Sequence, residues 1–88
     1  MNNILNGAQT YVHLVVRDSC PVCSENLLKL NTLQQNDVPF KLTIINLDKG
    51  DTMPDYYGYI ITPSIFINNR LWKIGSVKES EIFKKLNP

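Results

Sequence analysis

The two cysteines of this 88-residue chain, Cys20 and Cys23, are separated by two residues in the sequence Cys-Pro-Val-Cys. They follow an apolar run at 11–16 and precede a stretch in which apolar residues recur every three or four positions. The run predicts a buried strand, and the recurrence predicts an amphipathic helix that begins near Pro21 and stops near Asn36. Cys20 should therefore lie at the N-terminus of a helix, with Cys23 one turn inside it.

A cysteine at a helix N-terminus is close to unpaired backbone N–H groups and to the positive end of the helix dipole. Both features favour the thiolate, which is the form of cysteine that attacks a disulfide. Arg17 should favour the thiolate further, whereas Asp18 would oppose it if its carboxylate pointed toward Cys20. The cysteine pair is therefore predicted to carry out thiol–disulfide exchange, with Cys20 exposed and Cys23 more buried.

The rest of the chain predicts further strands at 40–47, 64–68 and 71–74, and further helices at 52–57 and 77–86. Because a helix separates 40–47 from the first strand, these two strands should be parallel and joined by a right-handed crossover. Asn68 and Asn69 should form a tight turn between the last two strands, because asparagine tolerates positive φ. The predicted order is β-α-β-α-β-β-α.

This order predicts an α/β protein with a four-stranded mixed sheet and helices on both faces. A chain of 88 residues is expected to form one domain over 1–88. The polar residues at 1–9 are expected to be a loosely ordered lead-in or a single helical turn.

Composition argues against several classes of protein. The net charge is +1 and the basic residues are scattered, so no strong field attracts nucleic acid or an anionic membrane. No apolar stretch approaches the ~20 residues of a membrane-spanning helix, and the first eight residues lack the positive start of a secretory signal. The sequence therefore predicts a cytoplasmic protein. In a reducing cytosol, cysteines two residues apart are more often catalytic or metal-binding than structural.

With this order of elements, the chain resembles the thioredoxin superfamily, and in particular the glutaredoxins and glutaredoxin-sized thioredoxins. Three motifs carry the resemblance, and together they span nearly the whole chain after residue 10. They are the Cys-Pro-x-Cys sequence, Tyr57-Gly58 followed by Thr62-Pro63 and the strand at 64–67, and the hairpin through Asn68-Asn69 to Ile74-Gly75 with its final helix.

The resemblance implies a thioredoxin-like fold and a role for each matching residue. Cys20 would be the nucleophile and Cys23 the resolving thiol. Pro63 would follow a cis peptide bond and face the cysteine pair. Thr62 would bind an extended substrate through its backbone N–H and C=O, as an added strand. Arg17, three residues before the first cysteine, matches the Lys or Arg that glutaredoxins often carry there.

Together with Arg17, Thr62 and Pro63, Pro21 belongs to the substrate-binding residues that the resemblance implies. Glutaredoxins usually bind glutathione partly through Gly-Gly-x-Asp after the last strand, and the matching stretch here begins Gly75-Ser76 and lacks both the second Gly and the Asp. Gly75 and Ser76 remain candidate contacts for glutathione, although this departure argues against tight binding. Thioredoxins usually have a buried Asp six residues before the first cysteine, where this chain has Leu14.

The activity implied is that of a monomeric disulfide oxidoreductase with no bound cofactor and no metal. Its substrates would be protein or low-molecular-weight disulfides. Either glutathione or a thioredoxin reductase would supply the electrons. Nucleic acid and membranes are not expected among its partners.

Two alternatives stay open. The cysteine pair could hold a metal or an Fe–S cluster shared between two chains, since a zinc site needs four ligands and only His13 adds a further soft candidate here. His13 itself is predicted to be a strand residue with a hydrogen-bonded ring. The chain could also be a non-catalytic adaptor with an idle cysteine pair. Aromatic residues that could line a peptide groove, but more commonly complete a core, are Tyr56, Tyr57, Tyr59 and Trp72.

Overall fold

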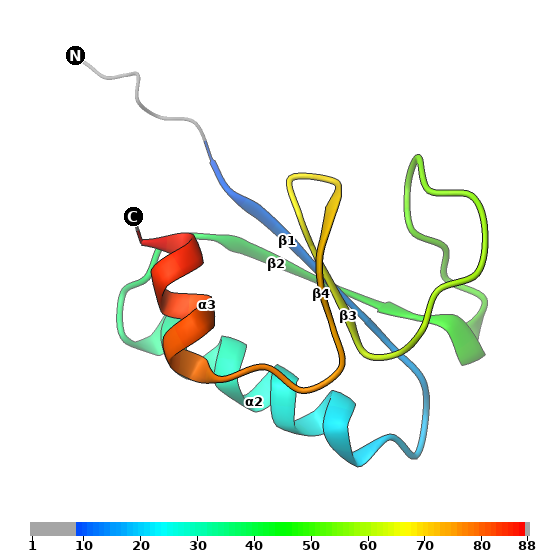
Figure 1. Ribbon diagram of the computed structural model, residues 1–88, viewed down its shortest axis with the longest axis horizontal. Coiled ribbons are helices and arrows are strands. Elements are labelled where there is room, and N and C mark those ends of the chain that lie inside the picture. Colours follow the sequence, from blue (N-terminus) through cyan, green and yellow to red (C-terminus); the bar gives the residue numbers. More distant parts are fainter. Residues whose placement is uncertain (1–8, 88) are drawn as a thin grey trace.

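The computed structural model describes residues 9–87 (Figure 1). Residues 1–8, which hold most of the predicted lead-in, lie outside the described residues. In chain order the elements are β1 (Tyr11–Val16), α2 (Pro21–Gln35), β2 (Lys41–Asn46), the 3₁₀ helix η1 (Leu47–Lys49), β3 (Ser64–Ile67), β4 (Arg70–Ile74) and α3 (Glu79–Leu86).

The four strands form one mixed sheet in the order β2-β1-β3-β4. β1 runs parallel to β2 and antiparallel to β3, and β3 pairs antiparallel with β4 across a register shift between Ile65 and Phe66. Asn68 and Asn69 both have positive φ, 50° and 67°, as a two-residue hairpin turn of the I′ type requires. The predicted α/β class and the four-stranded mixed sheet are confirmed.

Both helices pack on one face of the sheet (Figure 1). Alternate residues of β1 point toward them, namely Val12, Leu14 and Val16. Leu30 and Leu33 from α2, with Ile82 and Leu86 from α3, complete this larger core. Within residues 9–87, neither helix has the length and apolar character needed to cross a membrane.

The opposite face of the sheet is covered by a loop, so the prediction of helices on both faces is wrong for the described residues. The predicted helix at 52–57 does not form. Pro54 disfavours helical geometry at Met53, and Asp55 and Gly58 have φ of 56° and 124°, outside the helical region. The loop covers this face through its side chains, because Met53 and Tyr56 pack in a second apolar cluster around Val15.

Helix α2 starts and ends close to the predicted residues, but its inward face differs from the prediction. In an amphipathic helix, apolar residues are expected inward and polar residues outward. Leu28, however, is 68% exposed, and Asn26 is fully buried. The side of α2 that carries Asn26 lies against the segment after β4, which the helical periodicity of α2 does not reveal.

Candidate functional site

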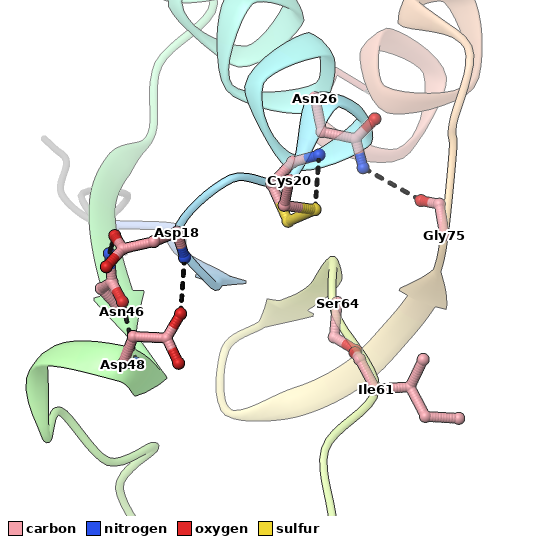
Figure 2. Close-up of a disulfide and its surroundings, with 9 residues drawn as sticks. Asp18, Cys20, Asn26, Asn46, Asp48, Ile61, Ser64 and Gly75 are labelled. Carbon is pink, nitrogen blue, oxygen red and sulfur yellow. Dashed lines mark hydrogen bonds between the residues drawn. A yellow bond between two sulfur atoms is a disulfide. The ribbon is translucent and has the colours of Figure 1, made fainter.

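Cys20 and Cys23 are joined by a disulfide, with their Cα atoms 5.2 Å apart (Figure 2). The bond lies at the beginning of α2, where the chain leaves the end of β1 and turns into the helix. Cys23 is only 3% exposed, whereas Cys20 is partly exposed. The sulfur of Cys20 is therefore the more accessible of the two, in the order that the sequence predicted.

Cys20 is the N-cap residue of α2, with an extended backbone at φ −120° and ψ 97°. Its Sγ accepts a hydrogen bond from the backbone N–H of Cys23 at 3.2 Å. Pro21 occupies the first helical position, where a missing N–H costs no intrahelical bond. The predicted location of the pair is confirmed, and one unpaired N–H of the helix N-terminus is aimed at the Cys20 sulfur.

The loop before Cys20 is held by Asp48 (Figure 2). One Asp48 carboxylate oxygen accepts from Arg17 Nη1 at 2.8 Å, and the other accepts from the backbone N–H of Asp18 at 2.8 Å. Asp18 Oδ1 in turn accepts from the side-chain amide of Asn46 at 3.0 Å. The Arg17 charge is thus paired with Asp48, and the Asp18 carboxylate is directed toward β2.

These contacts weaken the expected stabilisation of a Cys20 thiolate by Arg17. Arg17 lies in the same loop but its guanidinium is engaged by Asp48, so its support for a thiolate is weaker than an unpaired cation would give. Sequence reasoning did not identify Asp48 or Asn46. The signal for both was their position: Asn46 is the last residue of β2 and Asp48 is two residues beyond it. Because β2 is parallel to β1, the carboxyl ends of the two strands meet at one edge of the sheet.

Thr62 and Pro63 lie at the same end of the sheet as the disulfide. Ser64, the first residue of β3, pairs with Val15 near the end of β1. The Thr62–Pro63 peptide bond is cis, as the resemblance implied. Ser64 Oγ donates to the Ile61 carbonyl, so this bond spans the two residues between them.

Gly75 also lies at this end, because Ile74 pairs with Ser64. Its N–H donates to the Pro63 carbonyl at 2.8 Å, and its φ of 84° is one that glycine adopts readily. Ser76 is exposed beside it. The structure thus brings the candidate glutathione contacts Gly75 and Ser76 to the end of the sheet that carries the cysteine pair.

Asn26 is a buried polar residue that links α2 to this segment (Figure 2). Its Nδ2 donates to the Gly75 carbonyl at 2.9 Å, and its Oδ1 accepts from the Val77 N–H at 3.4 Å. Lys29 Nζ also donates to the Val77 carbonyl, at 2.7 Å. Sequence reasoning missed Asn26, although its position three residues after Cys23 places both on one face of the helix.

The start of α3 contains a further charged contact. Glu81 Oε1 accepts from the backbone N–H of Lys78 at 3.0 Å, and Glu81 Oε2 lies 3.4 Å from Lys73 Nζ. The Lys78 hydrogen bond, together with the charge of Lys73, lowers the pKa of Glu81 from its usual value of 4.5. The acidic group in this region therefore caps α3.

His13 lies in the centre of the sheet, between Thr43 of β2 and Phe66 of β3. Its Nδ1 is buried and has no hydrogen-bond partner in the described part of the chain, contrary to the prediction of a satisfied ring. Burial lowers the pKa of His13 below 6.5. Across residues 9–87, no group of three or more His, Cys, Asp or Glu side chains is arranged to hold a metal ion.

The aromatic residues divide between the core and the surface. Tyr56 packs edge-on against Phe66, with ring centroids 5.1 Å apart, and Trp72 packs against the helix-side core. Tyr57 and Tyr59, in the same loop as Tyr56, are 92% and 80% exposed.

A scan against protein-family models found no match for this chain, and a search of curated proteins found no significant match.

Proposed function

We propose that the protein is a thiol–disulfide oxidoreductase in which Cys20 attacks and Cys23 resolves. The observation that carries this proposal is the Cys20–Cys23 disulfide at the N-terminus of α2, with the more exposed sulfur accepting a helix N–H. In the reduced protein that N–H and the helix dipole would stabilise a Cys20 thiolate, which is the reactive form.

The chemistry starts from the reduced dithiol. The Cys20 thiolate attacks one sulfur of a substrate disulfide, forms a mixed disulfide and displaces the other substrate sulfur as a thiolate, which takes up a proton. Cys23 then loses its proton and attacks Cys20 Sγ. This step closes the Cys20–Cys23 bond and releases the second substrate sulfur as a thiolate, which is protonated in turn. Two electrons have passed from the protein to the substrate.

Substrate binding is proposed to use Thr62, the cis-linked Pro63 and Pro21, in a thioredoxin-like arrangement. The hairpin of β3 and β4 directly after Pro63 and the Cys-Pro-Val-Cys sequence at a helix start support this proposal. Thr62 would pair its backbone with an extended substrate at the end of the sheet that carries the disulfide. We further propose that the reaction takes place in the cytoplasm, on protein or small disulfides.

Recharging of the oxidised protein needs a two-electron thiol reductant, which we propose to be glutathione or a flavin-dependent thioredoxin reductase. Gly75 and Ser76 are suitably located for glutathione, but the acid that glutaredoxins place near them has no counterpart at Lys78. Comparing turnover with glutathione plus glutathione reductase against turnover with NADPH plus thioredoxin reductase identifies the donor.

The proposed function is tested with two matched serine variants, Cys23→Ser and Cys20→Ser. Cys23→Ser retains the attacking sulfur and should accumulate a mixed disulfide with bis(2-hydroxyethyl) disulfide or insulin, visible as added mass under non-reducing conditions. Cys20→Ser should form almost none, because Cys23 is buried. Both variants should lose catalytic turnover of insulin, because each lacks the dithiol.

Absence of a mixed disulfide in Cys23→Ser, together with no reduction of insulin by the wild type, would exclude the proposed function and favour a non-catalytic adaptor. A coloured wild-type protein, or one that carries stoichiometric zinc, would favour the metal-binding alternative instead.

A further inference from the structure

A cavity of about 240 Å³ lies at the end of the sheet that carries the disulfide, on the face covered by the loop. Its walls come from three segments: Arg17 from the loop after β1, Leu47 at the start of η1, and residues between 52 and 60 of the covering loop. Arg17 and Leu47 directly follow the last residues of β1 and β2, and these strands are parallel. The cavity is therefore at the same edge of the sheet as Cys20.

The cavity is also close to the reacting sulfur along the chain. Arg17 is three residues from Cys20, so their Cα atoms are at most about 11 Å apart. Ile60, which also lines the cavity, is two residues from Thr62, so the cavity is close along the chain to the backbone proposed to bind a substrate. A substrate strand advances about 3.3 Å per residue. Side chains two or three residues from its reacting cysteine can therefore span the separation between Cys20 and Arg17.

The lining favours an uncharged, apolar occupant. Leu47, Met53 and Ile60 are aliphatic, and Tyr56 and Tyr59 contribute aromatic rings. Among the described residues that line it, Arg17 is the one charged residue, and its guanidinium is paired with Asp48, which is not part of that lining. A carboxylate in the cavity would therefore have to compete with Asp48 for Arg17.

The volume favours a single side chain rather than a free ligand. Pockets for drug-sized molecules measure about 300–1,000 Å³, and this cavity is smaller. A second, smaller cavity of about 80 Å³ shares Tyr56, Tyr59 and Ile60 with it and continues toward Ile61. Of the three shared residues, Tyr59 is the exposed one, and it is three residues before Thr62 in the chain.

Given the thiol–disulfide activity proposed above, we infer that this cavity selects protein substrates that carry a large aliphatic or aromatic residue two or three positions from the reacting cysteine. The occupant is that side chain, and Tyr59 forms one wall against it. Burial of such a side chain adds binding free energy that a substrate with glycine at the same position lacks.

Tyr59→Ala and Tyr57→Ala form a matched pair that tests this inference. Both tyrosines are highly exposed in the same loop, but Tyr59 lines both of the cavities described above and Tyr57 lines neither. The substrates are two synthetic peptide disulfides that differ only in Phe or Gly at the second and third positions from the cysteine, with bis(2-hydroxyethyl) disulfide as a side-chain-free reference.

We expect the wild type to prefer the Phe peptide by about tenfold in kcat/KM. Tyr59→Ala should lose most of that preference, while Tyr57→Ala and Tyr59→Phe should keep it. All four proteins should reduce bis(2-hydroxyethyl) disulfide at the same rate, which shows that the variants are folded and active.

Equal rates for the Phe and Gly peptides with the wild type, or equal losses in Tyr59→Ala and Tyr57→Ala, would overturn the inference while leaving the proposed activity intact. If the wild type reduced neither bis(2-hydroxyethyl) disulfide nor insulin, and Cys23→Ser trapped no mixed disulfide, the proposed activity itself would be excluded, and the inference with it.

Discussion

At the scale of single residues, Asp48 binds charged and polar groups of the loop that leads to the attacking cysteine. Its two carboxylate oxygens hold the Arg17 guanidinium and the Asp18 N–H, and Asp18 is two residues from Cys20. The carboxylate adds a negative charge near Cys20 and occupies the nearest cation in the loop. Both effects oppose the thiolate that the helix N-terminus favours.

Asp48→Asn should therefore shift the pH profile of Cys20 alkylation to lower pH. Two unit charges roughly 10 Å apart in water interact by about 0.4 kcal/mol, equivalent to about 0.3 pH units. The rate of iodoacetamide reaction with reduced protein, measured in the Cys23→Ser background, reports the profile. Asp37→Asn removes an equal charge beyond the far end of α2 and serves as the control. An unchanged or upward-shifted profile in Asp48→Asn would contradict the role of Asp48.

His13 gives the protein a pH-dependent stability. Burial lowers its folded-state pKa, whereas in the unfolded chain the pKa is near its usual 6.5. As the pH falls below 6.5, the unfolded chain binds a proton that the folded protein resists, so folding free energy is lost until the folded pKa is reached. Above 6.5 the ring is neutral in both states and has no such effect.

Replacing His13 with Thr, a good strand former, should reduce the fall in Tm between pH 7.5 and pH 5. Thermal unfolding followed by circular dichroism at both pH values provides the measurement. The comparison within each protein removes any constant difference in stability that the substitution causes. An equal fall in Tm for wild type and variant would mean that His13 is not responsible.

At the scale of secondary-structure elements, Asn26 fixes α2 to the chain that follows β4. Its amide contacts Gly75 and Val77, and the Gly75 N–H continues the connection to the Pro63 carbonyl. A helix that carries Cys23 is thereby joined to two loops at the same end of the sheet. A hydrophobic residue of similar size would fill the space but leave those backbone groups unpaired.

Asn26→Ala should destabilise the protein by about 2 kcal/mol, because the Gly75 carbonyl and Val77 N–H lose a buried partner. Asn31→Ala is the control, since Asn31 is exposed on the same helix and alanine has the higher helix propensity. Urea denaturation gives both free energies of unfolding. If the two variants were equally stable, the Asn26 hydrogen bonds would contribute nothing measurable.

At the scale of the whole molecule, the sheet has two differently covered faces. Two helices close one face over the larger core, and a loop closes the other over a smaller cluster around Val15 and Phe66 (Figure 1). Loops retain more freedom than helices and leave more of their side chains in water. The exposed tyrosines and the cavity beside Arg17 belong to this loop-covered face, whereas Cys20 and Cys23 pack against the helix-side core beyond the end of β1.

Much of this arrangement could be predicted from local sequence. The apolar run at 11–16 became β1 with the predicted bounds, Pro21 marks the first turn of α2, and Asn68-Asn69 forms the predicted turn. Each of these depends on a preference that acts within a few residues: burial of consecutive apolar side chains, the fixed φ of proline, and the tolerance of asparagine for positive φ.

Contacts between distant segments determined the rest. Asn26 is buried because Gly75, 49 residues later, supplies a partner for its amide, and Arg17 is neutralised by Asp48, 31 residues later. The segment at 52–57 is a loop rather than a helix, and its apolar side chains are still buried because they pack against the sheet. The periodicity of apolar residues predicts which residues share a face of one helix or strand, but it does not predict which other element will pack against that face.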